Sequence, residues 1–242
     1  KNKSIESSHV SLLKYSYLKL KNNKYKHHLK KHYETLVCEP DLHKPFVAFN
    51  MHYQPEMTSN PSGDIFVDQL LCIEILAKNL PGDYFIYVKE HRSQFYSHGE
   101  GHTGRIKEFY NDILKYQQVR LIPLNYDPFT LINHSCAIAT VTGTSGWEGM
   151  VLGKPVIIFG ITWYEKYDGV LKITDEKSAK EITNFIENFK FDERNLLSYL
   201  YAVDKNALKA YYLRDQKESA NMPEEECVNV LIQTILKEVD KK

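Results

Sequence analysis

Residues 136–160 contain two short apolar runs with a small-residue turn and a helical stretch between them. The segment reads CAIATVTGTSGWEGMVLGKPVIIFG, with apolar residues at 137–141, the turn at 142–146, a helical stretch at 147–152 and a second apolar run at 156–159. This order predicts a strand, a turn, a helix and another strand. Two strands joined through a helix are typical of parallel neighbours in a sheet, which favours an α/β architecture.

Six apolar runs of this kind alternate with helical segments along the chain. We expect strands at residues 46–51, 84–89, 119–122, 137–141, 156–159 and 170–173. We expect helices at residues 5–35, 65–80, 103–117, 128–133, 147–152, 176–188, 192–213 and 223–239. In the first helix, one side carries Leu12, Leu13, Tyr17 and Leu20. The alternation predicts a doubly wound parallel sheet of about six strands in the order 3-2-1-4-5-6.

The turn at residues 142–146 contains two glycines and three hydroxyl side chains. Glycine has no Cβ, so the backbone can approach a ligand closely, and the N–H groups at the start of the following helix stabilise an anion. Small residues are also what a tight connection between a strand and a helix requires for packing. The pattern alone leaves both interpretations open.

Polar and aromatic residues follow four of the predicted strands, where doubly wound folds bind their ligands. The candidates are His52, Gln54 and Glu56 after the first strand, Lys89, Glu90 and His91 at the second, Thr142, Gly143, Thr144, Ser145, Gly146 and Glu148 after the fourth, and Trp163 and Tyr164 after the fifth. Because the carboxyl ends of parallel strands meet at one edge of the sheet, these loops are expected to converge. The sequence therefore predicts a ligand site there.

Several of these candidates also have a structural interpretation. A histidine after a strand can cap a backbone group, Lys89 can extend its ammonium to solvent, and Glu148 can stabilise the start of a helix. A carboxylate beside a nucleotide-binding turn can instead accept hydrogen bonds from ribose hydroxyls. We expect Trp147 to lie in the core, and Trp163 and Tyr164 to be exposed.

Charge and cysteine usage exclude some classes of protein. Lysine plus arginine equals aspartate plus glutamate, at 31 each, so the chain has no net charge to favour nucleic acid. Residues 1–44 hold ten lysines and four acids; this run is typical of a solvated helix face, and it could also contact phosphate or an anionic membrane surface. The scattered cysteines lack metal-binding spacing, and Cys72 and Cys136 are expected to be buried thiols. No apolar run is long enough to span a membrane and no signal peptide opens the chain, so we expect a cytoplasmic protein.

Motifs of other nucleotide enzymes and hydrolases are missing. No G-x-G-x-x-G follows the first strand, no G-x-x-x-x-G-K-[ST] occurs, and Ser145 is not in a G-x-S-x-G sequence. A metal site would have to combine distant histidines. The glycine-rich residues 99–104 follow no strand directly, so we interpret them as a flexible surface loop that could act as a lid. We therefore expect neither a metal nor a cofactor.

Four segments together resemble the capsule polysaccharide biosynthesis family. These segments are HYQPE after the first strand, YVKEH at the second, D-P-F-x-L-I before the fourth, and TVTGTSGWEG-x-x-L-G-K-P-V-I-x-F-G-x-x-W-Y. The resemblance covers about residues 46–173. Family members are glycosyltransferases of the GT-B architecture, including β-Kdo transferases that use CMP-Kdo. The family's second-strand motif usually runs His-Pro, whereas this chain has His91-Arg92.

The resemblance implies a Rossmann-like domain that forms the C-terminal, nucleotide-sugar-binding half of a two-domain enzyme. It implies that His91 touches the phosphate or ribose of the donor and that the turn at 142–146 cradles the phosphate. We expect a helical N-terminal extension and linker at 1–45, the Rossmann-like domain at 46–190 and C-terminal helices at 191–242. The chain is then a fragment, or a partner domain on its N-terminal side comes from elsewhere, and no catalytic residue is assigned.

The expected function is transfer of a sugar, with CMP-Kdo favoured as donor, onto a capsule or other surface polysaccharide or glycolipid. A glycan or glycolipid acceptor would be the second substrate. The basic N-terminal segment would give peripheral contact with the inner face of the membrane. Two alternatives remain open: half of a sugar-nucleotide epimerase, or a non-catalytic capsule-assembly module that docks through residues 22–32.

Overall fold

The computed structural model describes residues 12–55, 59–211 and 221–239. The chain divides into two compact units, residues 1–192 and 193–242. The first unit contains the sheet together with α1 (Leu12–Leu36), which lies in the segment predicted as an N-terminal extension. The second contains α8 (Glu193–Asn206) and α10 (Glu224–Val239). The first unit carries the candidate site.

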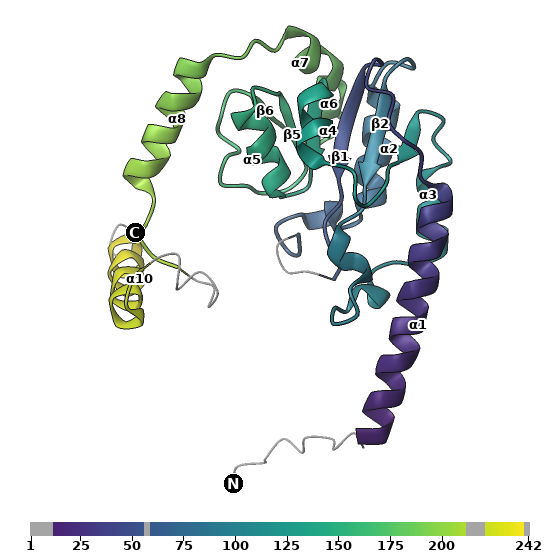
Figure 1. Cartoon of the computed structure of the whole chain (residues 1–242). Coiled ribbons are helices and arrows are strands. Elements are labelled where there is room, and N and C mark those ends of the chain that lie inside the picture. The colour runs from purple at the N-terminus through teal and green to yellow at the C-terminus, as the bar shows by residue number, and fades with distance from the viewer. Residues whose placement is uncertain (1–11, 56–58, 212–220, 240–242) are drawn as a thin grey trace. The chain divides into compact units, whose positions relative to one another are not determined.

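The sheet of the first unit has six parallel strands (Figure 1). They are β1 (Phe46–Asn50), β2 (Phe85–Lys89), β3 (Val119–Leu121), β4 (Ala137–Thr140), β5 (Val156–Ile158) and β6 (Val170–Lys172). The strand order is β3-β2-β1-β4-β5-β6, which confirms the predicted α/β Rossmann-like topology. In register, Phe49 of β1 pairs with Val88 of β2 on one side and with Ala139 of β4 on the other.

Helices in the first unit connect consecutive strands. They are η1 (Asp64–Val67), α2 (Gln69–Asn79), η2 (Arg92–Phe95), η3 (Gly101–Thr103), α3 (Lys107–Ile113), α4 (Pro128–His134), α5 (Thr144–Val151), α6 (Glu176–Lys180) and α7 (Ile182–Asn188). Two of these differ in extent from the prediction: α3 is shorter than residues 103–117, and the helix predicted at 176–188 is divided into α6 and α7. Aspartates cap several of them, as Asp68 does by accepting a hydrogen bond from Leu70 N–H at the start of α2.

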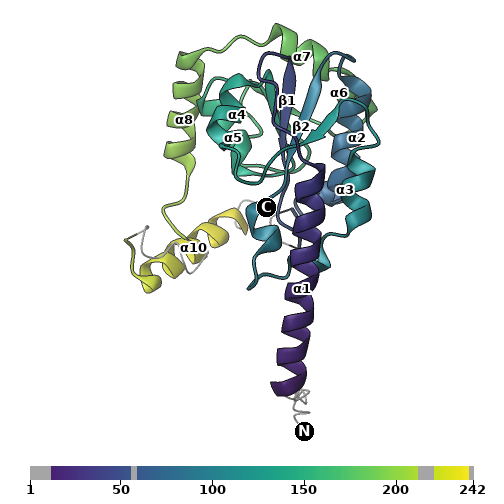
Figure 2. The ribbon, with the colours of Figure 1, turned by 45° about the vertical axis from the view of Figure 1, so that its right-hand side comes forward.

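The two faces of the sheet bury alternate residues of each strand. Val47 and Phe49 of β1 pack with apolar side chains of α1, α2, α3, α6 and α7, whereas Phe46 and Ala48 pack with those of α4. Figure 2 shows α2 and α3 on one side of the sheet and α4 and α5 on the other. Because both faces are covered, the strands are apolar runs, and the polar residues lie at their ends.

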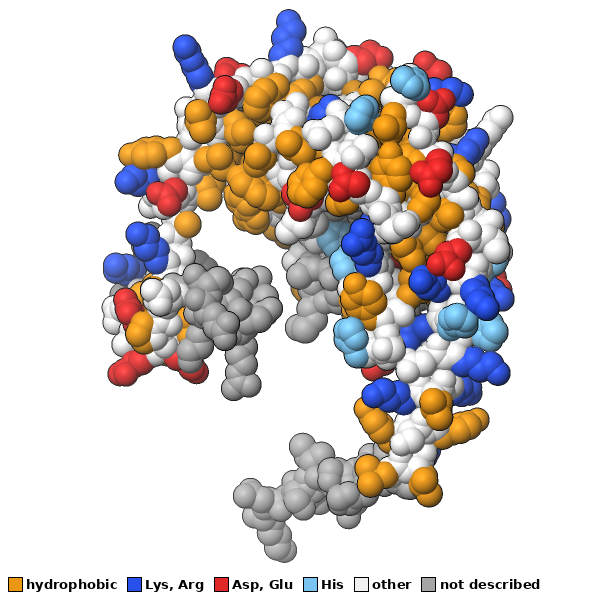
Figure 3. Space-filling view, viewed as in Figure 1, with side chains coloured by type: hydrophobic (Ala, Val, Ile, Leu, Met, Phe, Trp, Pro, Cys, Tyr) orange, Lys and Arg blue, Asp and Glu red, His pale blue; other side chains and the backbone are white. Residues whose placement is uncertain are grey.

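Helix α1 is buried only in its C-terminal half. Its buried residues are Lys26, Leu29 and Tyr33. The apolar side predicted from the sequence, Leu12, Leu13, Tyr17 and Leu20, is instead 65–84% exposed. Figure 3 shows orange apolar side chains at the start of this helix and blue lysines farther along it. This side therefore forms no part of the core of the first unit.

The two predicted buried thiols differ. Cys72 is fully buried in α2, where burial raises the pKa of its thiol well above the ordinary value. Cys136, just before β4, is only partly buried, because it precedes the strand at the edge of the core.

Candidate functional site

A cavity of about 610 Å³ opens at the carboxyl ends of β1, β2 and β4. Its lining includes nine of the predicted residues: His52, Lys89, Glu90, His91, Thr142, Gly143, Thr144, Ser145 and Glu148. Gln54, Gly146, Trp163 and Tyr164 are not in the lining. Glu56 lies outside the described residues. The predicted convergence of loops therefore holds for β1, β2 and β4, and the loop after β5 lies behind them.

The turn between β4 and α5 brings backbone N–H groups to the cavity. Helix α5 begins at Thr144, three residues earlier than predicted, so Thr144 and Ser145 occupy its first turn. Their N–H groups have no acceptor within the helix, and among the described residues no other acceptor binds them. The cavity thus has an α-helix N-terminus in its wall, where the helix dipole favours negative charge.

The glycines of this turn are required for close packing. A Cβ at Gly143 would lie 2.6 Å from Thr140 Oγ1 and 3.3 Å from the His52 ring. A Cβ at Gly146 would overlap the phenol of Tyr164. Neither glycine has a positive φ. Packing is therefore a sufficient reason for both glycines, and the N–H groups at the start of α5 are what make the turn suited to an anion.

Tyr164 lies beneath this turn and is buried, which corrects the prediction that it is exposed. Only 1% of its surface is accessible, and its hydroxyl donates a hydrogen bond to the carbonyl of Gly143. Burial raises the pKa of the Tyr164 phenol, and the charge of Glu148 adds to this. Tyr164 supports the turn from the side away from the cavity.

Trp163, the residue before Tyr164, is 55% exposed, as predicted. Its ring packs on that of Trp147 with centroids 4.8 Å apart. Trp147 is only partly buried, so its predicted place in the core is wrong. The reason is that α5 starts earlier than predicted, which turns this residue toward the loop after β5.

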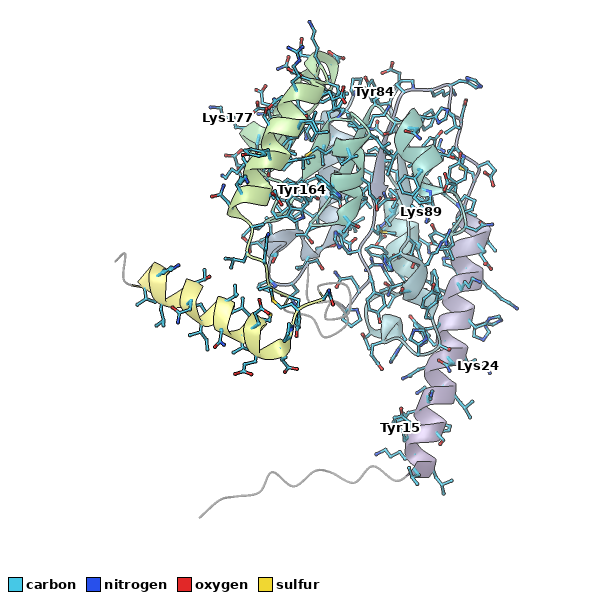
Figure 4. The ribbon with its side chains drawn as sticks, turned by 60° about the vertical axis from the view of Figure 1, so that its left-hand side comes forward. Tyr15, Lys24, Tyr84, Lys89, Tyr164 and Lys177 are labelled. Carbon is cyan, nitrogen blue, oxygen red and sulfur yellow. The ribbon has the colours of Figure 1, made fainter. Side chains whose placement is uncertain are left out.

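Lys89 ends β2 and is 9% exposed, so it does not extend to solvent (Figure 4). Among the described residues, its ammonium has neither a hydrogen-bond acceptor nor an ion-pair partner. Burial lowers the pKa of Lys89, and the charge of Arg92 adds to this, while Glu90 and Asp127 oppose it. A buried cation without a close anion costs free energy, which a bound anion would offset.

The two cavity histidines have defined tautomers. His91 Nδ1 accepts a hydrogen bond from Ser93 N–H at 3.2 Å, so the neutral ring carries its proton on Nε2. His52 Nε2 accepts from Thr142 N–H at 3.1 Å, so its ring carries the proton on Nδ1. His52 therefore links the end of β1 to the turn after β4, and His91 caps the start of η2. At this capped end Arg92 replaces the family's usual proline and begins η2.

The Glu90 carboxylate points away from the cavity, into the core. It accepts hydrogen bonds from Arg105 Nε at 2.9 Å and from the Tyr110 hydroxyl at 2.8 Å. Burial and the adjacent carboxylate raise the pKa of Tyr110. Glu90 was predicted to bind the ligand, but its side chain is satisfied by the protein because strand alternation turns it to the face opposite Lys89.

Gln54 also makes contacts within the protein. Its backbone N–H donates to Gln94 Oε1 at 2.9 Å, and its side-chain amide donates to Ser59 Oγ at 2.9 Å. These contacts hold the start of the loop after β1.

Residues 99–104 are anchored, which does not fit a flexible lid. Lys26 of α1 donates to the carbonyls of Tyr96, Ser97 and Gly99 at 2.7, 3.1 and 2.6 Å. The Tyr53 hydroxyl accepts from Glu100 N–H at 2.7 Å. Residues 101–103 form η3. The loop that begins at Tyr96, itself in the cavity lining, is thus a fixed wall.

Several lining residues were not among the candidates: Asn50, Met51, Tyr53, Arg92, Ser93, Tyr96, Pro128 and Thr140. Tyr53 and Arg92 are sequence neighbours of chosen histidines, so a wider window around each strand end would have included them. Tyr96 and Pro128 come from segments that no strand-end rule selects. Within residues 12–55, 59–211 and 221–239, no three His, Cys, Asp or Glu side chains are placed to hold a metal ion. None of the described helices is long and apolar enough to cross a membrane.

The fold and site define a doubly wound α/β protein with an anion-suited cavity at the carboxyl edge of its sheet. The model of the capsule polysaccharide biosynthesis protein family matches residues 57–200, more than half of the chain. The chain therefore belongs to the capsule polysaccharide biosynthesis family.

Curated relatives carry the same family's functions. The chain is similar to the capsule polysaccharide modification protein LipA of Neisseria meningitidis serogroup A, with 21% identity over 155 residues. The match covers 64% of this chain and 17% of LipA, and the serogroup B protein matches over the same shares. The chain thus spans under a fifth of the length of the curated relatives it matches.

Two solved structures represent the structural likenesses. The β-Kdo 2,7 transferase KpsC of Thermosulfurimonas dismutans is 16% identical, with a TM-score of 0.43 over 65% of this chain and 49% of that one. The UDP-GlcNAc 2-epimerase of Methanocaldococcus jannaschii is 18% identical, with a TM-score of 0.44 over 76% of this chain and 53% of that one.

Proposed function

We propose that the cavity binds a nucleotide-sugar donor and that the chain is the donor-binding part of a glycosyltransferase that builds a surface polysaccharide. The observation that carries this proposal is Lys89. A lysine that is nine-tenths buried in a cavity wall, with no partner among the described residues, favours an anionic ligand. Membership of the capsule family supports a saccharide as the rest of that ligand.

Other groups in the lining suit the diphosphate or phosphate of such a donor. The N–H groups of Thr144 and Ser145 start α5, and the protonated Nε2 of the neutral His91 ring is a hydrogen-bond donor. With the Lys89 ammonium these groups form a set of donors from two different loops. Donors of this kind stabilise the negative charge that develops on a departing nucleotide phosphate, which is a main source of rate enhancement in group transfer.

Glu148 supplies the complementary acceptor. It lies in the cavity lining as the fifth residue of α5, and its carboxylate has no partner among the described residues. A carboxylate in this place can accept hydrogen bonds from ribose hydroxyls. The cavity volume of about 610 Å³ lies within the range typical of sites for small molecules.

The finer assignments follow from the resemblance of the sequence to β-Kdo transferases. We propose CMP-Kdo as the donor and a glycan or glycolipid as the acceptor, with no metal in the reaction. A second domain on the N-terminal side would supply the opposite wall of the active site. We also propose that the protein acts in the cytoplasm at the inner face of the membrane, where the lysines of α1 would face anionic lipid.

Titration of the full chain with CMP, UDP and GDP, by calorimetry or NMR, tests the donor site. We expect one nucleotide to bind and Lys89→Met to weaken that binding strongly. Lys180→Met is the matched control, because Lys180 is an exposed lysine on α6 that pairs with Glu176. If none of the three nucleotides binds, the donor-site proposal is wrong.

Product analysis separates transfer from epimerisation. We expect CMP-Kdo to be consumed when acceptor glycan and the partner domain are present. Conversion of UDP-GlcNAc to an epimer would replace the transferase by an epimerase.

A further inference from the structure

A buried ion pair lies directly behind the cavity. Glu90 Oε2 and Arg105 Nε are 2.9 Å apart, and the two side chains are 0% and 3% exposed. The same carboxylate oxygen accepts a hydrogen bond from the Tyr110 hydroxyl, and the Arg105 guanidinium lies 4.4 Å from the centroid of the Phe109 ring. Both charges are therefore enclosed by protein and are satisfied without a ligand.

Each member of the pair also holds the backbone of one cavity histidine. Glu90 Oε1 accepts from His91 N–H at 2.8 Å. Arg105 Nη2 donates to the carbonyl of His52 at 3.1 Å. His52 and His91 follow the neighbouring strands β1 and β2, so a single ion pair joins the two chain segments that carry the histidines.

Stability alone is a poor reason for such a pair. Removing two charges from water costs about as much as their attraction returns, and apolar side chains of similar volume often give an equally stable protein. A buried charged pair is better explained when its directional hydrogen bonds select one arrangement of the chain. Here the directional bonds end on the backbones of His52 and His91.

We propose that Glu90 and Arg105 are positioning residues that fix the two cavity imidazoles, and that neither binds the ligand itself. Glu90 sets where the chain leaves β2 and Arg105 sets where it leaves β1. The inference rests on the proposed function only for the identity of the ligand. Its statement about the two imidazoles applies to the protein without any ligand.

The decisive variant replaces both charges, because removing one alone leaves the other buried and unpaired. In the Glu90→Leu, Arg105→Leu double variant, we expect the fold to persist with a melting temperature near that of the wild type. The imidazole ¹⁵N resonances of His52 and His91 should lose the pattern of one fixed tautomer each. The affinity for CMP should fall roughly tenfold or more, because the donors are no longer held in place.

Glu165→Gln, Lys172→Gln is the matched control. These residues also form an ion pair, at 2.6 Å between Lys172 Nζ and Glu165 Oε2, and neither lines the cavity. Its histidine resonances and CMP affinity should equal those of the wild type. Unchanged histidine resonances in a folded double variant would overturn the inference.

Arg105→Lys decides the question if the double variant does not fold. Lysine can keep the pairing with Glu90 but lacks the second donor that reaches the His52 carbonyl. We expect the His52 resonances to change and those of His91 to stay, whereas no change at His52 contradicts the inference. If the wild type binds no CMP, the proposed function fails, and the histidine resonances still decide the role of the pair.

Discussion

The hydroxyl of Tyr164 donates a hydrogen bond to the carbonyl of Gly143, the residue just before α5. This bond ties the loop after β5 to the turn after β4, although the two residues are 21 positions apart in the chain. The same phenol lies against Gly146, where no Cβ could fit. The start of α5, with its N–H groups toward the cavity, is therefore held from below by one tyrosine.

Gly146→Ala should destabilise the protein, although alanine is the better helix former. The new Cβ would overlap the Tyr164 phenol, and overpacking of this kind costs about 1–3 kcal/mol, more than the gain in helix propensity of about 1 kcal/mol. Chemical denaturation measures the change. Gly82→Ala is the control, because nothing lies within 4 Å of a Cβ there, and its stability should be unchanged or slightly higher. Equal effects of the two substitutions would show that Tyr164 does not restrict the turn.

Lys89→Met should make the unliganded protein more stable at neutral pH. Burial lowers the pKa of Lys89 in the folded state, so the unfolded chain binds this proton more tightly. The charged lysine then costs stability at every pH below its folded pKa, and the cost disappears as the pH rises from that value toward the ordinary 10.5. The stability difference between variant and wild type should therefore shrink in alkaline solution, as thermal melts across pH would show. A variant less stable than the wild type at pH 7 would contradict this.

Glu148→Ala and Ser145→Ala should differ in their effect on nucleotide affinity. Ser145→Ala removes a hydroxyl and leaves the backbone N–H groups, so the loss should be about 1 kcal/mol. Glu148→Ala removes an acceptor for ribose hydroxyls and should cost roughly 1.5–3 kcal/mol. Calorimetric titration with the nucleotide that binds the wild type measures both.

A helix-dipole role for Glu148 makes a different prediction, namely a lower melting temperature and unchanged binding. Glu148 lies beyond the first turn of α5, where the influence of the dipole is weak, so we expect the melting temperature to stay nearly constant. Unchanged affinity in Glu148→Ala would exclude contact with the ligand.

Lys26→Met should loosen the cavity wall formed by residues 96–104. Three backbone carbonyls lose the donor that Lys26 provides, so amide hydrogen exchange in this loop should become faster. Because Tyr96 lines the cavity, nucleotide affinity should also fall. Lys31→Met, an exposed substitution in the same helix, should change neither quantity. Exchange that stays at the wild-type rate would mean that the loop is held by its other contacts.

The order of the strands and the edge at which the site lies follow from local sequence patterns. A strand covered on both faces must be apolar along its length, so the six runs are visible in the sequence, and the helical segments between them require parallel neighbours. The same pattern places His52, His91 and the turn after β4 at one edge. Families of α/β proteins share this logic, which is why the sequence motifs and the family match agree on residues 57–173.

The direction of individual side chains at that edge was decided by tertiary contacts. Lys89 and Glu90 are adjacent in the sequence, yet Lys89 faces the cavity while Glu90 is drawn into the core by Arg105, fifteen positions away, and by Tyr110. Trp163 and Tyr164 divide in the same way, because the Gly143 carbonyl offers a partner to the tyrosine alone. Local sequence carries the period of a strand or helix, but the partner that satisfies a buried polar group comes from a distant part of the chain, and only the folded structure brings that partner into place.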